Sequence, residues 1–408
     1  MVEVIILKIA FRNIFRHKKR SALTGLMMAG GCALFALSIG MVDGGYGNLI
    51  DMFTRDHTGH IQVHKKGYLD KPSIYSTIDN PDSVGKKIQS VAHVQSWAPR
   101  VYTPALAFAG KKTTNVRVVG IDPIREARTT RIKYKVDIGR FISEAPLNEA
   151  VISDRLARLL KIDLNGEIAL ITQGADGSIA NELFTVVGIT GKSGETSGTS
   201  TCYMHIKTAQ DFLSLGGGVH EIAVVLTDQA LTMKTVGLIK SALQDPSLEV
   251  DPWQVVESQF YRAMKADIKG SWYTIVIFTI IIAVGVLNTV LMIILERTRE
   301  FGVLKALGTR PLQIFMLIVY ETVFLAVLSI IIGTAVGMSA NWWFHEYGIT
   351  LANPIEYGGY FFDTITAKIT LRSLVLPAMI IFGTALIVSI WPAIRAARII
   401  PVKAMRSN

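Results

Sequence analysis

The chain contains only two cysteines among its 408 residues, and only 18% of the residues are charged. Cys32 lies in an uncharged run and Cys202 lies far outside it, so the two are not expected to pair, and no disulfide framework is predicted. Half of the residues are hydrophobic, which is unusual for a soluble protein of this length. The composition therefore predicts insertion into a membrane.

Recognisable catalytic and nucleotide-binding motifs are also missing. The tripeptide GKS at 191–193 would need a glycine five residues earlier to form a phosphate-binding loop, and that position is Val186. No nucleophile stands at a recognisable spacing from a base. We therefore expect no catalytic residue, no cofactor-binding residue and no nucleotide site in this chain.

Three histidines, His57, His60 and His64, lie close together in the sequence, and the last two would share one face of a strand. That spacing is compatible with a metal ion, but no cysteine or dense carboxylate group completes a ligand set nearby. The prediction is a solvated strand surface and no metal site.

Four apolar runs are long enough to cross a hydrocarbon core of about 30 Å as helices. The first run could instead be a signal peptide, because Gly31 and Cys32 faintly resemble a lipoprotein cleavage site. Its apolar stretch is longer than such a signal uses and continues past Cys32, which favours a membrane span. The predicted spans are residues 21–42, 271–295, 312–342 and 374–392.

Basic residues gather at three places outside these runs: before the first, between the second and third, and after the fourth. These places hold 14 basic residues against 3 acidic ones, whereas residues 43–271 hold 26 basic and 25 acidic residues. The positive-inside rule then predicts that both termini and the segment 296–311 are cytoplasmic. The basic residues behind the net charge of +10 are therefore expected to face anionic lipid and the cytosol, and no nucleic acid is expected as a partner.

The order of the runs predicts the domain organisation. A basic amphipathic helix at 1–20 is expected to lie in the membrane interface, with Ile5, Leu7, Phe11, Ile14 and Phe15 among the headgroups. The remaining segments are a periplasmic domain at 43–270, a cytoplasmic coupling segment at 296–311, a periplasmic loop at 343–373 and a cytoplasmic tail at 393–408. The aromatic stretch 339–372, which overlaps this loop, is assigned no role beyond an interfacial belt.

Periodicity within the large domain predicts a mixed α/β fold. Its two ends, 43–112 and 216–270, are expected to form one split α/β subdomain, with a β-rich subdomain at 113–215 inserted between them. Strands are expected at 60–64, 114–121, 167–172, 183–190 and 221–226, and helices at 83–94, 153–162 and 230–244. Ser153 is a candidate helix N-cap.

Small and charged residues stand out within the spans. Gly40 and Gly44 are four residues apart near the first span, as are Gly333 and Gly337 in the third, a spacing that lets helices approach closely, either within the chain or in a dimer. Glu321 is the one ionisable residue well inside a span, where a charge costs about 2.5–3.5 kcal/mol. It is expected to face another helix or to be protonated. It would either form an interhelical hydrogen bond or belong to a transport route or hinge.

The stretch ERTREFGVLKALGTRP, residues 296–311, places a short charged segment between two apolar runs. The second span is expected to continue as a helix through Arg299 and to stop near Gly308. Thr309 would then cap a new helix with Pro311 in its first turn.

Three apolar residues of this segment, Phe301, Leu304 and Leu307, are expected to form a ridge on the short helix. An apolar ridge flanked by charge suits a groove on a cytoplasmic protein.

The stretch 296–311 resembles the coupling segment of the FtsX-like ABC permeases, the superfamily of MacB and LolC/LolE. The tail WPAIRAARIIPVKAMR, residues 391–406, is similar to the ending of that family, and the predicted topology matches it over the whole chain. The stretch GHIQVHKKGY at 59–68 is most similar to the lipoprotein-releasing branch.

The resemblance implies an α-helical membrane protein of the bacterial inner membrane, with four transmembrane helices and a large α+β, MacB-like periplasmic domain. It implies a non-catalytic permease that pairs with a second permease subunit, identical or a sister chain, and with two copies of a separate ATPase that bind ATP and Mg. The residues implied to couple to the ATPase are Arg297, Arg299, Glu300, Phe301, Gly302, Leu304, Lys305, Leu307 and Gly308.

The implied function is release of lipoproteins from the membrane, with lipids and a lipoprotein or other amphiphile as partners. The alternatives are export of peptides or other amphiphiles, transmission of ATP-driven motion to a periplasmic cell-wall hydrolase, and a free-standing receptor. An apolar cleft in the large domain would favour transport, and an exposed apolar patch would favour transmission.

Overall fold

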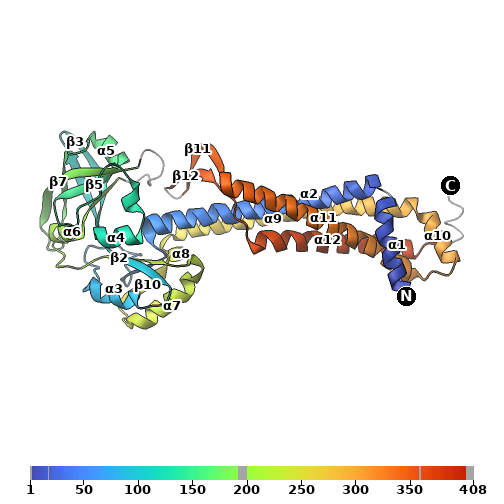
Figure 1. Cartoon of the computed structure of the whole chain (residues 1–408). Helices are drawn as coiled ribbons and strands as arrows, with labels where there is room; N and C mark the ends of the chain where they lie inside the picture. The colour runs from blue at the N-terminus through green and yellow to red at the C-terminus, as the bar shows by residue number, and fades with distance from the viewer. Residues whose placement is uncertain (1, 17, 192–199, 358–359, 401–408) are drawn as a thin grey trace. The chain divides into compact units, whose positions relative to one another are not determined.

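The computed structural model describes residues 2–16, 18–191, 200–357 and 360–400 (Figure 1). The chain forms two compact units. The membrane unit comprises residues 1–47, 265–349 and 365–408, and the sheet unit comprises residues 48–264 and 350–364. Most of the GKS tripeptide and the tail from residue 401 onward lie outside the described residues.

Four helices are long and apolar enough to cross a membrane, which confirms the four expected spans. The longest has 39 residues, or about 58 Å at 1.5 Å per residue, nearly twice the thickness of a hydrocarbon core. Its first seven residues therefore belong to the sheet unit rather than to the membrane unit. The four helices are α2 (Lys18–Phe53), α9 (Ser258–Glu296), α11 (Pro311–Tyr347) and α12 (Leu371–Ala397).

Two shorter helices complete the membrane unit: α1 (Val2–Arg16) and α10 (Thr298–Ala306). α1 is the expected basic amphipathic helix, and it packs on α11, where the Phe11 and Phe324 rings meet edge to face at 5.8 Å. Leu7 is exposed on α1. The side chains of the other apolar residues named for this helix are outside the description.

One ten-stranded sheet forms the sheet unit, in the order β10-β1-β9-β2-β3-β8-β5-β7-β4, and β6 pairs with both β2 and β7. Because β6 joins β2 to β7, six strands close into a ring: β2, β3, β8, β5, β7 and β6. The bounds are β1 (Ile61–Lys65), β2 (Val94–Ala109), β3 (Lys112–Ile121), β4 (Val136–Gly139), β5 (Glu149–Ser153), β6 (Glu167–Gln173), β7 (Ile179–Thr190), β8 (Thr201–His205), β9 (Glu221–Leu226) and β10 (Leu248–Pro252). A separate hairpin pairs β11 (Ile349–Tyr357) with β12 (Tyr360–Ile365).

Short helices connect the strands of this unit. α3 and α7 pack against each other. α3 also packs against β2, and α7 against β10, on the apolar face of the sheet that carries Val63 and Val250. The helical segments are η1 (Thr54–Thr58), α3 (Pro81–Gln89), α4 (Pro123–Thr129), η2 (Ile132–Lys135), α5 (Asp154–Leu160), α6 (Ile206–Phe212), η3 (Gln229–Leu231), α7 (Thr232–Leu243) and α8 (Trp253–Val256).

Most local expectations for this unit are confirmed. Strands occur at all five expected places, and Ser153 Oγ caps α5 by accepting from the Leu156 N–H at 3.4 Å. The helix expected to run to residue 94 ends instead at Gln89, because β2 already begins at Val94. The boundaries of the split and inserted subdomains remain a prediction.

Candidate coupling site

The segment between α9 and α11 forms a separate helix, α10, rather than a continuation of α9. α9 ends at Glu296, and Arg297 leaves the helical conformation with φ −96° and ψ 9°. After α10, Gly308 has φ +94°, a left-handed conformation that glycine adopts without strain. The expectation that α9 continues through Arg299 is therefore wrong, and the expected stop near Gly308 is confirmed.

The start of α11 lies one residue later than expected. Arg310, not Thr309, is the N-cap, and its backbone N–H donates to Gln313 Oε1 at 2.8 Å. Pro311 is the first helical residue, a position where the missing N–H of proline leaves no donor unpaired. Its expected place in the first turn is confirmed.

One face of α10 packs into the membrane unit. Phe301 is 0% exposed and belongs to the apolar core of that unit, Gly302 is buried, and Leu304 packs against the same core. The expectation that Phe301 lies on an exposed ridge is therefore wrong. α10 has apolar residues on more than one side, and the core takes the large ring because burying it removes the most apolar surface from water.

The opposite face of α10 is exposed. Arg299, Val303 and Leu307 follow one another at a spacing of four residues, so they share one side of the helix. Val303 is 43% exposed and Leu307 is 80% exposed. Arg299 and Leu307 were among the residues expected to couple to an ATPase, and Val303, which lies between them on this side, was not.

Arg297 links three helices through a nearly buried guanidinium, since its side chain is 7% exposed. Its Nε donates to Glu300 Oε2 at 2.9 Å, and its Nη1 donates to Glu321 Oε2 at 3.1 Å. When the Asn13 amide is oriented with its oxygen toward Arg297, that oxygen accepts from Nη1 at 3.2 Å and from Nη2 at 2.8 Å. One side chain thus joins α1, α10 and α11 at the end of α9.

Glu321 faces another helix, as a charge within a span must. Its side chain is 14% exposed and forms an ion pair with Arg297, at the junction of α9 and α10. Both residues line a small cavity among α2, α9 and α11. A role for Glu321 in a transport route or hinge stays a prediction.

Lys305 ties α10 to the end of α12. Its Nζ donates to the carbonyl oxygens of Ala397 at 2.7 Å and of Ile399 at 2.8 Å. Ala397 is the last residue of α12, where carbonyls have no partner within the helix and a cation complements the negative end of the helix dipole. α10 is therefore held to α9 and α11 through Arg297 and Glu300, and to α12 through Lys305.

Each of the four glycines predicted to mediate packing lies close to another segment of the membrane unit. Gly333 and Gly337 face α2, and Gly40 faces α11, so the structure places these approaches within one chain. The nearest atom to a Cβ added at each position is Asn341 Oδ1 at 2.3 Å for Gly40, Thr366 O at 2.4 Å for Gly44, Ala29 O at 2.4 Å for Gly333 and Ala36 Cβ at 2.8 Å for Gly337.

Within the sheet unit, the end of α2 and the start of α9 meet in an aromatic cluster. The Phe53 ring lies 4.7 Å from the Phe260 ring and 5.4 Å from the Trp253 ring, both edge to face. Phe53 and Trp253 are almost fully buried. The two long helices therefore pack together where they reach the sheet.

A buried ionic network fixes the segment that follows α2. Arg100 on β2 is 0% exposed and donates to both carboxylate oxygens of Glu126, to Glu221 and to the His57 carbonyl of η1. Burial raises the pKa of Glu221, and the Arg100 and Arg117 charges oppose that shift. The network was not predicted, because its members come from four separate segments of the sequence.

The histidines placed on a solvated strand surface are mostly buried. His60 is 1% exposed and its Nδ1 accepts from the Leu226 N–H at 3.0 Å, while His64 is 0% exposed. The expectation of a solvated surface is wrong for both, because His60 is hydrogen-bonded to β9 and the Tyr68 ring lies 6.1 Å from the His64 ring. Glu249 and Asp251 lie beside His64, a grouping that the sequence order does not reveal.

Two family models match the chain. The MacB-like periplasmic core domain matches residues 21–241, and the FtsX-like permease C-terminal region matches residues 272–401. The first match alone covers more than half of the chain.

Similar proteins include permeases of several kinds. The lipoprotein-releasing system transmembrane protein LolC of Neisseria meningitidis is 23% identical over 81% of this chain and 83% of its own length. The macrolide export ATP-binding/permease protein MacB of Campylobacter jejuni is 23% identical over 80% of this chain but only 52% of its own length. The ABC transporter permease YtrF of Bacillus subtilis is 27% identical over 72% of this chain and 69% of its own length.

One solved structure with similarity is the periplasmic region of MacB from Actinobacillus actinomycetemcomitans. It aligns with 52% of this chain and 98% of its own length, at 13% identity and a TM-score of 0.37. That score is too low to support an argument, and the fold assignment rests on the family models.

Proposed function

Because the chain belongs to the FtsX-like ABC transporter permeases with a MacB-like periplasmic core domain, we propose that it couples ATP hydrolysis by a separate ATPase subunit to movement of its sheet unit. The observation that carries this proposal is the two-sided character of α10. Its inner side is fixed to three long helices, and its outer side exposes apolar residues with no counterpart among the described residues.

The outer side of α10 is the proposed docking surface for the ATPase. Val303 and Leu307 supply the apolar centre, and Arg299 and Arg310 lie exposed on either side of them. A short helix with an apolar centre and a charged rim fits into a groove on a globular partner. Burying these two side chains would contribute on the order of 2–4 kcal/mol.

The inner side of α10 is the proposed transmission element. A force on α10 would act on α9 and α11 through Arg297 and Glu300, and on α12 through Lys305. α9 is one continuous helix whose first turn packs in the sheet unit beside Phe53 of α2. Movement of α10 would therefore reach the sheet unit along α9.

The subunit is proposed to lie in the bacterial inner membrane with α10 and both termini in the cytoplasm and the sheet unit in the periplasm. The basic residues around α1, α10 and the end of α12 support this orientation. The proposed assembly contains two such permeases, identical or sister chains, and two ATPase copies that hold ATP and Mg.

Release of lipoproteins from the membrane is the proposed activity. The neutral balance of charge in residues 43–271 and the LolC relative, which covers most of both chains, support it. The cargo would be taken from the outer leaflet by the sheet unit, so no polar channel through the membrane is required.

The docking surface is tested by a double substitution, Val303→Asp with Leu307→Asp. Both side chains are exposed, so the membrane unit should remain folded while a groove on the ATPase would have to bury two charges. The chain is purified from its native membrane in mild detergent, and the bound proteins are identified by mass spectrometry. Ile179→Asp is the matched control, because Ile179 is also 80% exposed but lies on β7.

We expect an ABC ATPase with the unmodified chain and with the Ile179→Asp control, but not with the double variant. An ATPase that stays bound to the double variant would contradict the docking surface, and its absence from every sample would contradict the permease assembly. Lipoproteins in the complex that leave when ATP is added would support the proposed cargo. A cell-wall hydrolase in their place would favour a signal-transmitting permease.

A further inference from the structure

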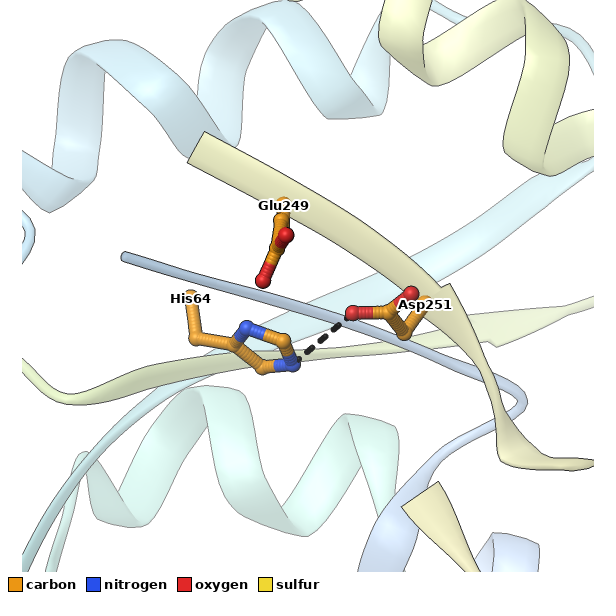
Figure 2. A group of neighbouring side chains, drawn as sticks. All are labelled: His64, Glu249 and Asp251. Atoms are coloured by element: carbon orange, nitrogen blue, oxygen red, sulfur yellow. Dashed lines mark ion pairs between the residues drawn. The ribbon is translucent and has the colours of Figure 1, made fainter. Parts of the chain in front are cut away.

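A histidine and two carboxylates meet on the polar face of the sheet unit, between β1 and β10. In the antiparallel register of these strands, His64 pairs with Glu249 and Gln62 pairs with Asp251. Alternate residues of a strand share a face, so the side chains of His64, Glu249 and Asp251 lie on the same side. Figure 2 shows the two carboxylates of β10 pointing toward the imidazole of β1.

The ring nitrogens of His64 have no hydrogen-bond partner within the described part of the chain. Its side chain is 0% exposed, and neither ring nitrogen makes a hydrogen bond. A buried polar group without a partner is rare in native proteins and is destabilising, so each such group requires an explanation. Here the orphaned nitrogens are directed at the two carboxylates.

A simple ion pair does not explain the grouping. One imidazole carries at most one positive charge, whereas two carboxylates lie beside it. The neutral form of an imidazole is the form that binds metal ions.

The separation of His64 and Asp251 fits a shared metal ion better than a hydrogen bond. His64 Nε2 lies 3.5 Å from Asp251 Oδ2, and one ligand atom from each of the three residues lies within 4.8 Å of the others. Two ligands at about 2.1 Å from a tetrahedral ion are ~3.4 Å apart. The Gly67 N–H donates to Glu249 Oε2 at 2.9 Å, which orients that carboxylate as outer contacts orient metal ligands.

We propose that His64, Glu249 and Asp251 bind a divalent first-row transition metal ion, with Zn²⁺ as the representative. One imidazole and two carboxylates form a nitrogen and oxygen donor set that suits zinc or manganese, whereas calcium and magnesium sites are built from oxygen ligands. Three protein ligands leave further positions for water.

The ion would join the two strands that lead to the long helices. β1 follows α2 through η1, and β10 is followed by α8 and α9. A bond between β1 and β10 would therefore brace the part of the sheet unit that receives α2 and α9. It would act as a structural clamp, and no reaction is assigned to it.

The test uses the full chain in detergent, carrying an affinity tag without histidine and stripped with a chelator. Zn²⁺, Mn²⁺ and Ca²⁺ are titrated separately by calorimetry, and the melting temperature is recorded with and without each ion. The variants are Glu249→Gln and Asp251→Asn, which keep the side-chain shape. Glu167→Gln, an exposed carboxylate on β6, is the control.

We expect one tightly bound Zn²⁺ per chain and a rise in melting temperature with the unmodified chain and the Glu167→Gln control. Losing an outer contact of a metal ligand typically weakens binding 10- to 100-fold, so loss of a ligand should weaken it by at least about 100-fold. Equal Zn²⁺ affinity in Asp251→Asn, binding only at millimolar Zn²⁺, or preference for Ca²⁺ would each overturn the proposal. Melting curves without metal show whether the variants are folded.

Discussion

Replacing Arg297 with methionine should destabilise the membrane unit more than any other single change of charge at the coupling site. The guanidinium is 7% exposed and Glu321 is 14% exposed, so their ion pair is largely shielded from water. Removing one partner of such a pair costs about 3–5 kcal/mol, because the other charge stays buried without compensation. Glu300 adds little, since its side chain is 42% exposed and screened.

The companion substitution Glu321→Gln should have a smaller effect. Arg297 would keep its hydrogen bond to Glu300 and its contact with Asn13, so the loss is that of one charge-assisted hydrogen bond, about 1.5–3 kcal/mol. The double variant removes both charges at once and should be less destabilised than the sum of the two single variants. The difference should be about 1–3 kcal/mol.

The assay is the melting temperature of the full chain in mild detergent, without the ATPase. At about 2–4 °C per kcal/mol for a folding unit the size of the membrane unit, Arg297→Met should lower its melting temperature by ~6–20 °C. Arg299→Met is the matched control, because Arg299 is exposed on α10. This variant should melt within a few degrees of the unmodified chain. Equal melting of Arg297→Met and the control, or additive losses in the double variant, would refute the buried link.

Three further outcomes are expected. Gly333→Ala should destabilise the chain by about 1–3 kcal/mol, since its Cβ would lie 2.4 Å from a backbone oxygen of α2, while Gly383→Ala, with no atom within 4 Å, should be neutral or stabilising in the same melting assay. The hydrogen bonds from Arg140 hold the pKa of Glu149 at about 2, below its ordinary 4.5, so this stabilisation is present above pH 4.5 and is lost as the pH falls toward 2. Glu149→Gln should therefore lower the free energy of unfolding by on the order of 1 kcal/mol at pH 7, a modest loss because Arg140 is half exposed. Near pH 2 the substitution should have no effect. Measuring unfolding at both pH values tests this direction. Burial raises the pKa of Cys202 to about 12, so a polar maleimide should label it only after unfolding, as mass spectrometry would show.

Local sequence patterns were enough to predict the four spans and part of the sheet unit. A long apolar run with at most one charge has few alternatives to a spanning helix, and four such helices are found. The Glu296 to Pro311 segment was also recognisable, because a charged stretch between two spans must leave the membrane, and Gly308 marks the end of its helix.

The orientation of α10 was not predictable from the segment itself. Phe301, Val303 and Leu307 are all apolar, and nine residues are too few for a clear amphipathic pattern. Phe301 turns inward because the neighbouring helices provide a core for its ring, which is a property of the assembled membrane unit.

The buried polar groups were missed for a related reason. Arg100 and Glu126 meet only after β2 and α4 pack together, and His64 meets Glu249 only through the register of β1 with β10. Pairings between distant segments depend on the topology of the sheet, which the order of the residues does not specify.

Crosslinking at single positions of α10 in the native membrane tests the ATPase docking surface most directly. A photoreactive amino acid is placed at position 303, on the exposed face, or at position 301, on the buried face, and the crosslinked partners are identified by mass spectrometry. Docking predicts an ABC ATPase attached at position 303 and attachment only within the chain at position 301. If position 303 captures lipid or the chain itself but no ATPase, α10 is not the docking helix.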